Sequence, residues 1–108
     1  AIACDGSTPL HLASYYGHIE TCRALISEGA SVGAMDNDGS TPLHNAAYRG
    51  AASVCSELIK RGAEVNSKQD VNGQTPLHLA CEGAHEGAVR VILQAGGDLQ
   101  AQATGAEA

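Results

Sequence analysis

The sequence predicts an all-α solenoid in which short helix-turn-helix units stack on one another and are joined by β-hairpin-like loops. The tetrapeptide Thr-Pro-Leu-His occurs three times, starting at Thr8, Thr41 and Thr75, at steps of 33 and 34 residues. A second marker keeps the same register: Gly29-Ala30, Gly62-Ala63 and Gly96-Gly97. Apolar residues recur at helical spacing between these markers. Repeats of roughly 20–50 residues are typical of stacked repeat architectures.

The first helix of each copy is predicted to begin at the proline of the tetrapeptide. A threonine at the N-cap accepts a hydrogen bond from a free backbone N–H, and a proline at the next position presets φ for a helix. Gly17 and Gly50 end the first two of these helices, because glycine adopts the left-handed conformation readily. In the third copy, Gly83 stands one place early and Ala84 occupies the glycine position. The sequence therefore leaves the end of that helix open.

A second helix follows in each copy, with an apolar stripe along one face. The stripe consists of Ile19, Cys22, Leu25 and Ile26 in the first copy, Ala52, Cys55, Leu58 and Ile59 in the second, and Val89, Ile92 and Leu93 in the third. The Asp/Asn/Gly-rich segments 36–39 and 70–73 predict tight turns between copies. A unit of this size cannot bury its apolar face alone, so neighbouring copies must stack and share a core.

A Thr-Pro-Leu-His signature on a period of 33 residues resembles the ankyrin repeat, and the resemblance covers about residues 3 to 100. It implies one ankyrin-repeat domain over residues 1–108, with repeats at about 3–35, 36–69 and 70–102 and a mobile tail at 103–108. We assign the extra residue of the 34-residue step to the loop stalk 66–69, where we expect a bulge. Ala3 stands where the other copies have Asp36 and Asp70, so the first turn lacks that acceptor.

The ends of the array lack the polar capping repeats that solenoids usually carry. The first copy is as apolar as the inner ones, and the chain stops on entering a fourth hairpin at residues 99–101. We therefore expect a piece of a longer array, with uncapped ends that allow self-association.

Composition argues against several classes of function. The chain has 6 Lys+Arg against 12 Asp+Glu, a net charge of −6, which disfavours nucleic acid as a partner. Its apolar runs are too short to cross a membrane, so no membrane insertion is expected. The chain starts at Ala1 without a Met, so a leader could have been removed. Unpaired thiols favour a reducing compartment, and we expect an intracellular location in the cytoplasm or nucleus.

The cysteines and histidines fit scaffold roles better than chemical ones. Cys22 and Cys55 occupy equivalent positions and are interpreted as small core residues, and no cysteine has the close paired spacing of a zinc site. The histidines repeat as well, at two positions of the repeat: His11, His44 and His78, and His18 and His85. No nucleophile motif or phosphate loop is present. We expect no enzyme activity and no catalytic, cofactor-binding or metal-binding residue.

The resemblance implies a partner protein that binds a concave surface of loop tips and first helices. The tip positions are Cys4, Asp5, Ser7, Asn37, Asp38, Ser40, Val71, Asn72 and Gln74, and the helix positions are Tyr15, Tyr16, Tyr48, Arg49, Glu82 and Gly83. Tyrosine and arginine are frequent interface hot spots. The alternative is that solvent-facing helix ends tolerate any amphipathic residue. The acidic members Asp5, Asp38 and Glu82 favour a basic or mixed-charge partner segment over an acidic one.

One modification is also predicted. Leu58, followed by Glu64-Val65-Asn66, is similar to the pattern recognised in ankyrin repeats by the asparaginyl hydroxylase of the oxygen-sensing pathway, with Asn66 as the acceptor. The alternative is that asparagine at this hairpin position is ordinary family sequence.

The leading hypothesis is a non-catalytic protein–protein interaction module of unidentified partner. Two alternatives stay open: the substrate-recognition part of an enzyme complex such as a ubiquitin ligase, and a structural or adaptor segment of a long ankyrin array.

Overall fold

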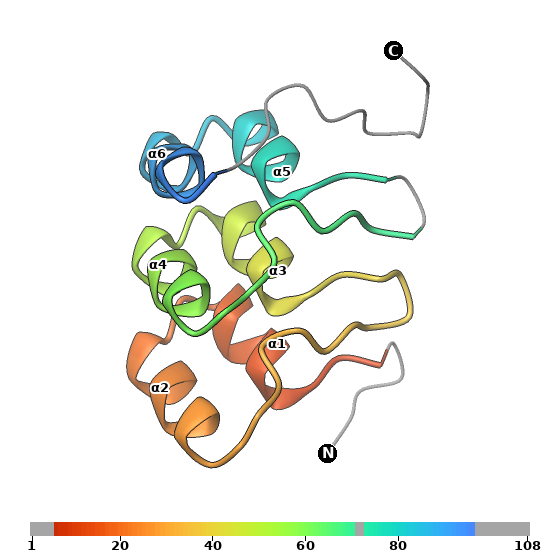
Figure 1. Cartoon of the computed structure of the whole chain (residues 1–108), viewed down its shortest axis with the longest axis vertical. Coiled ribbons are helices and arrows are strands. Elements are labelled where there is room, and N and C mark those ends of the chain that lie inside the picture. The colour runs from red at the N-terminus through yellow and green to blue at the C-terminus, as the bar shows by residue number, and fades with distance from the viewer. Residues whose placement is uncertain (1–5, 71–72, 97–108) are drawn as a thin grey trace.

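The computed structural model describes residues 6–70 and 73–96, which form three stacked helix pairs (Figure 1). The pairs are α1 (Pro9–Tyr15) with α2 (Ile19–Ser27), α3 (Pro42–Arg49) with α4 (Ala52–Lys60), and α5 (Pro76–Glu82) with α6 (Glu86–Gln94). Helices α1, α3 and α5 pack in one layer and α2, α4 and α6 in a second, while the connecting loops extend from the first layer. The described residues contain no strand. The predicted all-α stacked fold is confirmed.

The first helices begin at the predicted prolines because each is closed by a reciprocal cap. The side chain of the N-cap threonine accepts a hydrogen bond from the backbone N–H of the histidine three residues later. The Nδ1 atom of that histidine accepts in turn from the threonine N–H, at 3.0–3.1 Å in all three copies. Histidine thus takes the place that Glu or Gln has in the usual capping box. A cap of this kind is worth about 1 kcal/mol.

The other nitrogen of the histidine ring ties one repeat to the next. His11 Nε2 donates to the carbonyl of Ser40 at 2.7 Å, and His44 Nε2 donates to the carbonyl of Gln74 at 3.0 Å. Since Nδ1 accepts from the threonine N–H, the hydrogen-bond network assigns the proton to Nε2. The structural role predicted for His11 and His44 is confirmed.

The three first helices end in the same way, although the third lacks the glycine. Gly17 and Gly50 have φ of 72° and 76°, and Ala84 takes the equivalent left-handed position with φ of 57°. Gly83, which stands one place early, is right-handed with φ of −85°. An L-residue in the left-handed region costs about 1 kcal/mol. The third repeat therefore keeps the geometry of the fold at the expense of local strain.

The core lies between the two helix layers. Its largest members are the leucines of the signature and apolar residues of the second helices: Leu10, Leu43, Leu77, Leu58 and Ile92. Cys22 and Cys55 are fully buried, as predicted. Burial raises the pKa of the Cys55 thiol to about 12 and also raises that of Cys22, so both stay neutral thiols.

One prediction about the core is wrong. Leu93, assigned to the apolar stripe of α6, is 38 % exposed, whereas Ala88 on the same helix is fully buried. Helix α6 packs mainly against α4 and α5. In the described part of the chain, no further helix covers its remaining side.

The extra residue of the 34-residue step lies in the loop tip and not, as predicted, in the stalk 66–69. In the first loop the N–H of Asp36 donates to the carbonyl of Ser40, so three residues form the tip. In the second loop the N–H of Gln69 donates to the carbonyl of Gln74, so four residues lie between the bonded pair. Gln69 is therefore the structural equivalent of Asp36, and Asp70 that of Asn37. The stalk keeps the 33-residue register.

The loop tips are stacked closely on one another. The N–H of Asp70 donates to the carbonyl of Asp38 at 2.9 Å. A Cβ at Gly39, which has φ of 80°, would lie 2.6 Å from the backbone nitrogen of Asp70. Glycine is required there both by the backbone conformation and by the space available. The expectations for Ala3, for a fourth hairpin at 99–101 and for the tail 103–108 lie outside the described residues.

Candidate binding surface

An aromatic cluster stands at the ends of α1 and α3. The rings of Tyr15 and Tyr48 stack with centroids 6.2 Å apart, and Tyr16 meets Tyr15 edge to face at 5.0 Å. The guanidinium of Arg49 lies 4.8 Å from the centroid of Tyr15. Tyr15 is half-buried, whereas Tyr16 and Tyr48 are 60 % and 56 % exposed. The repeat period explains the stack, because Tyr15 and Tyr48 occupy the same position in neighbouring repeats.

A first depression, of about 360 Å³, lies between α1, α3 and the first loop. It combines aromatic, acidic and small polar side chains: Ser7, Leu12, Tyr15, Tyr16, Asp36, Asp38, Ser40 and Asn45. The Oδ1 atom of Asp36 accepts from the backbone N–H groups of Asp38 and Ser40, at 2.9 and 3.0 Å. These two bonds hold the Asp36 carboxylate at the edge of the depression. We call this hollow the acidic depression.

A second depression, of about 530 Å³, lies on the other side of the tyrosine stack. It is lined by Tyr48, Arg49, Leu79, Glu82, Gly83 and His85. Leu79 is only 8 % exposed. The Nε2 atom of His85 donates to the carbonyl of Tyr48 at 2.9 Å and so fixes the junction between the second and third repeats. The lining is mixed, since Arg49, Glu82 and His85 stand beside the apolar surface of Leu79 and the Tyr48 ring. We call this hollow the apolar depression after those last two residues.

The predicted partner-binding residues are only partly brought together. Tyr15, Tyr16, Tyr48, Arg49 and Glu82 line one or other depression. Asn37 and Asp38 are exposed at the loop tip, and Gln74 Nε2 donates to Glu82 Oε2 at 2.8 Å. Cys4, Asp5, Val71 and Asn72 lie outside the described residues.

Two predicted contact residues line the acidic depression but are almost fully buried. Ser7 and Ser40 are each only 5 % exposed. The Ser40 carbonyl accepts from His11, and its hydroxyl accepts from the side-chain amide of Gln69. Ser40 therefore serves the stacking of the loops.

Sequence reasoning missed the floor of both depressions. Leu12, which is 46 % exposed, and Leu79 occupy one position of the repeat, and Asn45 stands at the same position in the second copy. The amide of Asn45 donates to the carbonyl of His11 at 3.2 Å. This position directly follows the repeated Thr-Pro-Leu-His tetrapeptide, but it is leucine in two copies and asparagine in the other. A position that varies directly after an invariant signature is the sequence feature that could have identified this part of the surface.

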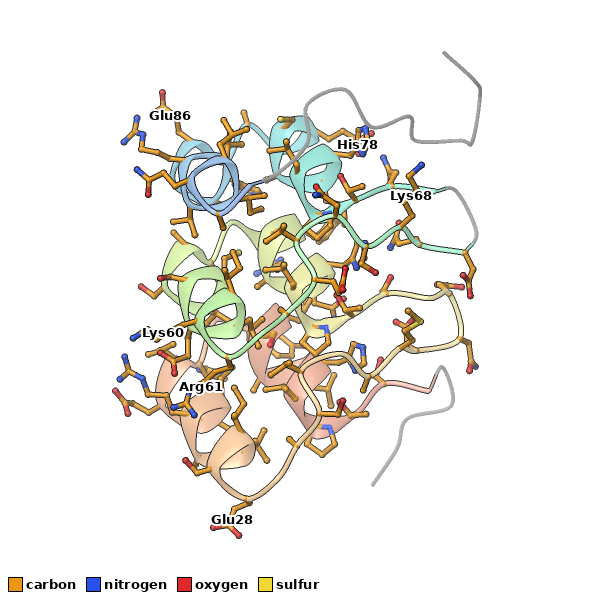
Figure 2. The ribbon with its side chains drawn as sticks, viewed as in Figure 1. Glu28, Lys60, Arg61, Lys68, His78 and Glu86 are labelled. Carbon is orange, nitrogen blue, oxygen red and sulfur yellow. The ribbon has the colours of Figure 1, made fainter. Side chains whose placement is uncertain are left out.

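The opposite face, formed by α2 and α4, carries a basic cluster around one carboxylate. Glu57 is 5 % exposed and pairs with Arg61 at 2.8 Å, with Arg23 of α2 at 3.5 Å and with Lys60 at 4.0 Å. Figure 2 shows Lys60 and Arg61 together near the end of α4, beside α2. Hydrogen bonding from Arg61 holds the pKa of Glu57 below its usual value. The cluster joins the first two repeats.

The predicted modification site lies away from both depressions. Asn66 is exposed, and its side-chain amide donates to the carbonyl of Gly96 at 3.3 Å. Hydroxylation of Asn66 stays a prediction. Mass spectrometry of protein from oxygenated animal cells tests it, and unmodified Asn66 throughout would contradict it.

The described residues meet the requirements neither of a metal site nor of a membrane-spanning helix. Within residues 6–70 and 73–96, no group of three His, Cys, Asp or Glu side chains could hold a metal ion. Cys22, Cys55 and Cys81 are free thiols. No helix in the described part of the chain is long and apolar enough to span a membrane.

A family model for ankyrin repeats, which describes three copies, matches residues 1–69 and 26–103. The two matches together extend over nearly the whole chain of 108 residues. The chain belongs to the ankyrin repeat family. No curated protein matches it closely.

Ankyrin repeats are generally protein–protein interaction modules and are typically non-catalytic. The two depressions and the tyrosine stack lie on the side of the ankyrin repeats formed by the first helices and the loops.

Proposed function

We propose that the chain is a non-catalytic interaction module that binds another protein through the concave surface of its loops and first helices. The observation that carries the proposal is the exposed tyrosine cluster between the acidic and apolar depressions. Tyr16 and Tyr48 both present most of their surface to solvent. Aromatic side chains with a polar end suit a protein interface.

The charge of the surface supports a basic or mixed-charge partner segment. Asp36 and Asp38 line the acidic depression, which no lysine or arginine among the described residues lines, and Glu82 and Arg49 both line the apolar depression. The net charge of −6 adds to the attraction at long range. An acidic partner segment would meet repulsion at this surface.

Affinity capture with a matched pair of variants tests the proposal. We expect Tyr16→Ala combined with Tyr48→Ala to lose proteins that the unaltered chain captures from a cell extract, as identified by mass spectrometry. The control is Met35→Ala combined with Leu93→Ala, which removes two large apolar side chains that are 56 % and 38 % exposed and line neither depression. Capture that is unchanged in the tyrosine variant would contradict the proposal.

The two alternative functions, substrate recognition in an enzyme complex and a structural or adaptor role, would use the same surface. They differ in which other proteins are captured together with the partner. Ubiquitin-ligase subunits among the captured proteins would favour the substrate-recognition setting. Components of a membrane skeleton would favour the adaptor setting.

A further inference from the structure

We propose that the concave surface recognises an extended partner segment with a lysine or arginine in the acidic depression and a large apolar residue three positions away in the apolar depression. This inference rests on the proposed function, since it names the chemistry of the partner at the same surface. It is built from four features of the two depressions.

The first feature is an aromatic wall that suits a cation. Tyr15, Tyr16 and Leu12 line the acidic depression, and the ring of Tyr16 is 60 % exposed. Lysine and arginine bury their alkyl stems on apolar surface and place their charge over aromatic faces. The chain already makes such a contact, since the guanidinium of Arg49 lies 4.8 Å from the centroid of Tyr15. The ring of Tyr16 also stacks with that of His18 at 6.2 Å, and a second cation can approach the part of the Tyr16 ring that stays exposed beside the acidic depression.

The second feature is a pair of carboxylates without a basic neighbour in the lining. Asp36 and Asp38 face the acidic depression, and no lysine or arginine is among the described residues that line it. The bonds from the backbone N–H groups to Asp36 hold one carboxylate in place before a partner arrives. A preorganised acid beside an aromatic wall favours a basic side chain over a neutral one.

The third feature is the apolar depression. Its apolar surface comes mainly from the ring of Tyr48, since Leu79 is only 8 % exposed, and Gly83 adds no side chain. Arg49 and Glu82 carry opposite charges at its edge, so neither sign of charge is favoured there. The hydrogen bond from His85 to the carbonyl of Tyr48 holds the depression open across the repeat junction. A leucine-sized side chain can pack on the Tyr48 ring there and occupy the space beside Gly83.

The fourth feature is the spacing of the two depressions. They belong to successive repeats and are separated by the Tyr15–Tyr48 stack. Packed helices lie roughly 8–10 Å apart, and an extended chain advances about 3.3 Å per residue. One repeat step therefore corresponds to about three residues of the bound segment. Both chain directions meet this spacing, so the basic residue can precede or follow the apolar one.

Binding of two fluorescein-labelled peptides measures this preference directly. Their sequences are Gly-Ser-Arg-Ser-Ser-Leu-Ser-Gly and the same with Arg and Leu exchanged. We expect saturable binding of at least one peptide by fluorescence polarisation at about 0.05 M salt, where surface charges are weakly screened. Replacing its arginine by glutamate should weaken binding at least about tenfold, because a like charge then faces the carboxylates. Replacing its leucine by serine should weaken binding as well.

Charge variants of the chain assign the effect to the acidic depression. Asp38→Lys should weaken binding of the arginine peptide at least about tenfold and strengthen binding of the glutamate peptide. Glu28→Lys changes the net charge equally at an exposed residue that ends α2, and it should alter binding less than about twofold. Asp38→Asn, which keeps the side-chain shape, should give an intermediate loss. Circular dichroism verifies that each variant is folded.

Three results would overturn the inference. They are no saturable binding of either peptide up to about 1 mM, equal binding of the arginine and glutamate peptides, and an equal loss in Asp38→Lys and Glu28→Lys. The outcome of the affinity capture that tests the proposed function does not depend on these peptide-binding results. Captured proteins that depend on Tyr16 and Tyr48 while the peptides show no charge preference would refute only this inference. Peptide binding without such captured proteins would refute only the proposed function.

Discussion

The two junctions between repeats share one backbone arrangement but differ in their side chains. Between the first and second repeats, Tyr15 stacks on Tyr48, and on the opposite face Arg23 pairs with Glu57. At the junction between the second and third repeats, Glu82 occupies the repeat position of Tyr15 and Tyr48. Ser56 and Val91 occupy the positions equivalent to Arg23 and Glu57, so the ion pair is not repeated. The second junction has instead the hydrogen bond from His85 to the carbonyl of Tyr48.

The residues common to both junctions explain why the fold tolerates this difference. The capping threonine, the buried leucine and the bridging histidine occur at each junction with nearly the same geometry. These residues supply the core and the caps, so the neighbouring surface positions are free to vary. Repetition therefore marks the scaffold, and the positions that depart from repetition are the ones that the scaffold leaves free to vary.

The largest expected effect breaks both junctions at once. Leu58→Ala removes a fully buried side chain from α4, which packs against both α2 and α6. We expect a loss of about 2–5 kcal/mol in the free energy of unfolding, because a cavity remains between the layers. Chemical denaturation measures it. Leu93→Ala, at an exposed position, is the control, and a comparable loss there would show that the core is placed wrongly.

Two separate substitutions of residues with positive φ, Gly50→Ala and Ala84→Gly, test the second junction. Gly50→Ala should cost about 1–2 kcal/mol, because φ is 76° and the new Cβ would lie 2.5 Å from the ring of His85. Ala84→Gly should raise the free energy of unfolding by about 0.5–1 kcal/mol by relieving the positive φ. Thermal denaturation distinguishes the two signs. A destabilised Ala84→Gly variant would contradict the strain assigned to the third repeat.

His44 should make the second junction sensitive to acid. Burial lowers the pKa of His44, so below its ordinary pKa of about 6.5 the unfolded chain binds a proton that the folded chain does not. Stability is then present above that pH and is lost as pH falls, by at most about 1.4 kcal/mol per pH unit from this group. His44→Gln retains a capping side chain but cannot titrate. Denaturation at several pH values between neutral and mildly acidic should show a shallower slope in this variant, and an unchanged slope would contradict the assignment.

The smallest expected effect concerns the ion pairs of the first junction. Hydrogen bonds from Arg61 lower the pKa of Glu57, so its contribution is present above the ordinary glutamate pKa of about 4.3 and is lost as pH falls through the folded value. Glu57→Gln should lower the melting temperature at neutral pH, and the difference should shrink in acid and at about 1 M salt. Glu20→Gln, at an exposed partner of Arg23, is the control. A difference that persists at high salt would mean that packing, not charge, carries the effect.

Much of the fold was predictable because its signals are local. A threonine followed by proline defines a helix start within two residues, and the three starts at Pro9, Pro42 and Pro76 are confirmed. The position of the extra loop residue was not predictable in the same way. Asp70 resembles Asp36 in sequence, but the backbone hydrogen bonds make Gln69 its equivalent. Only the pairing across the loop decides between those two registers.

The surface was predictable only in part, because burial depends on the neighbouring repeat. Tyr16 and Tyr48 were identified from their positions, and both are exposed as expected. Ser40 looked equally accessible in sequence, but His11 and Gln69 from other loops and helices cover and bond it. Leu79 was not identified, because a leucine after the signature is typical of core; it is indeed only 8 % exposed, and it also lines the apolar depression.

Hydrogen exchange of the backbone amides, with and without a captured partner, tests the central claim most directly. The claim is that the non-repeated residues of the first helices and loop tips carry recognition. It predicts added protection at 12–16, 36–40 and 45–49, with little change in α2 and α4. Added protection confined to α2 and α4, with none at the tyrosine cluster, would contradict it.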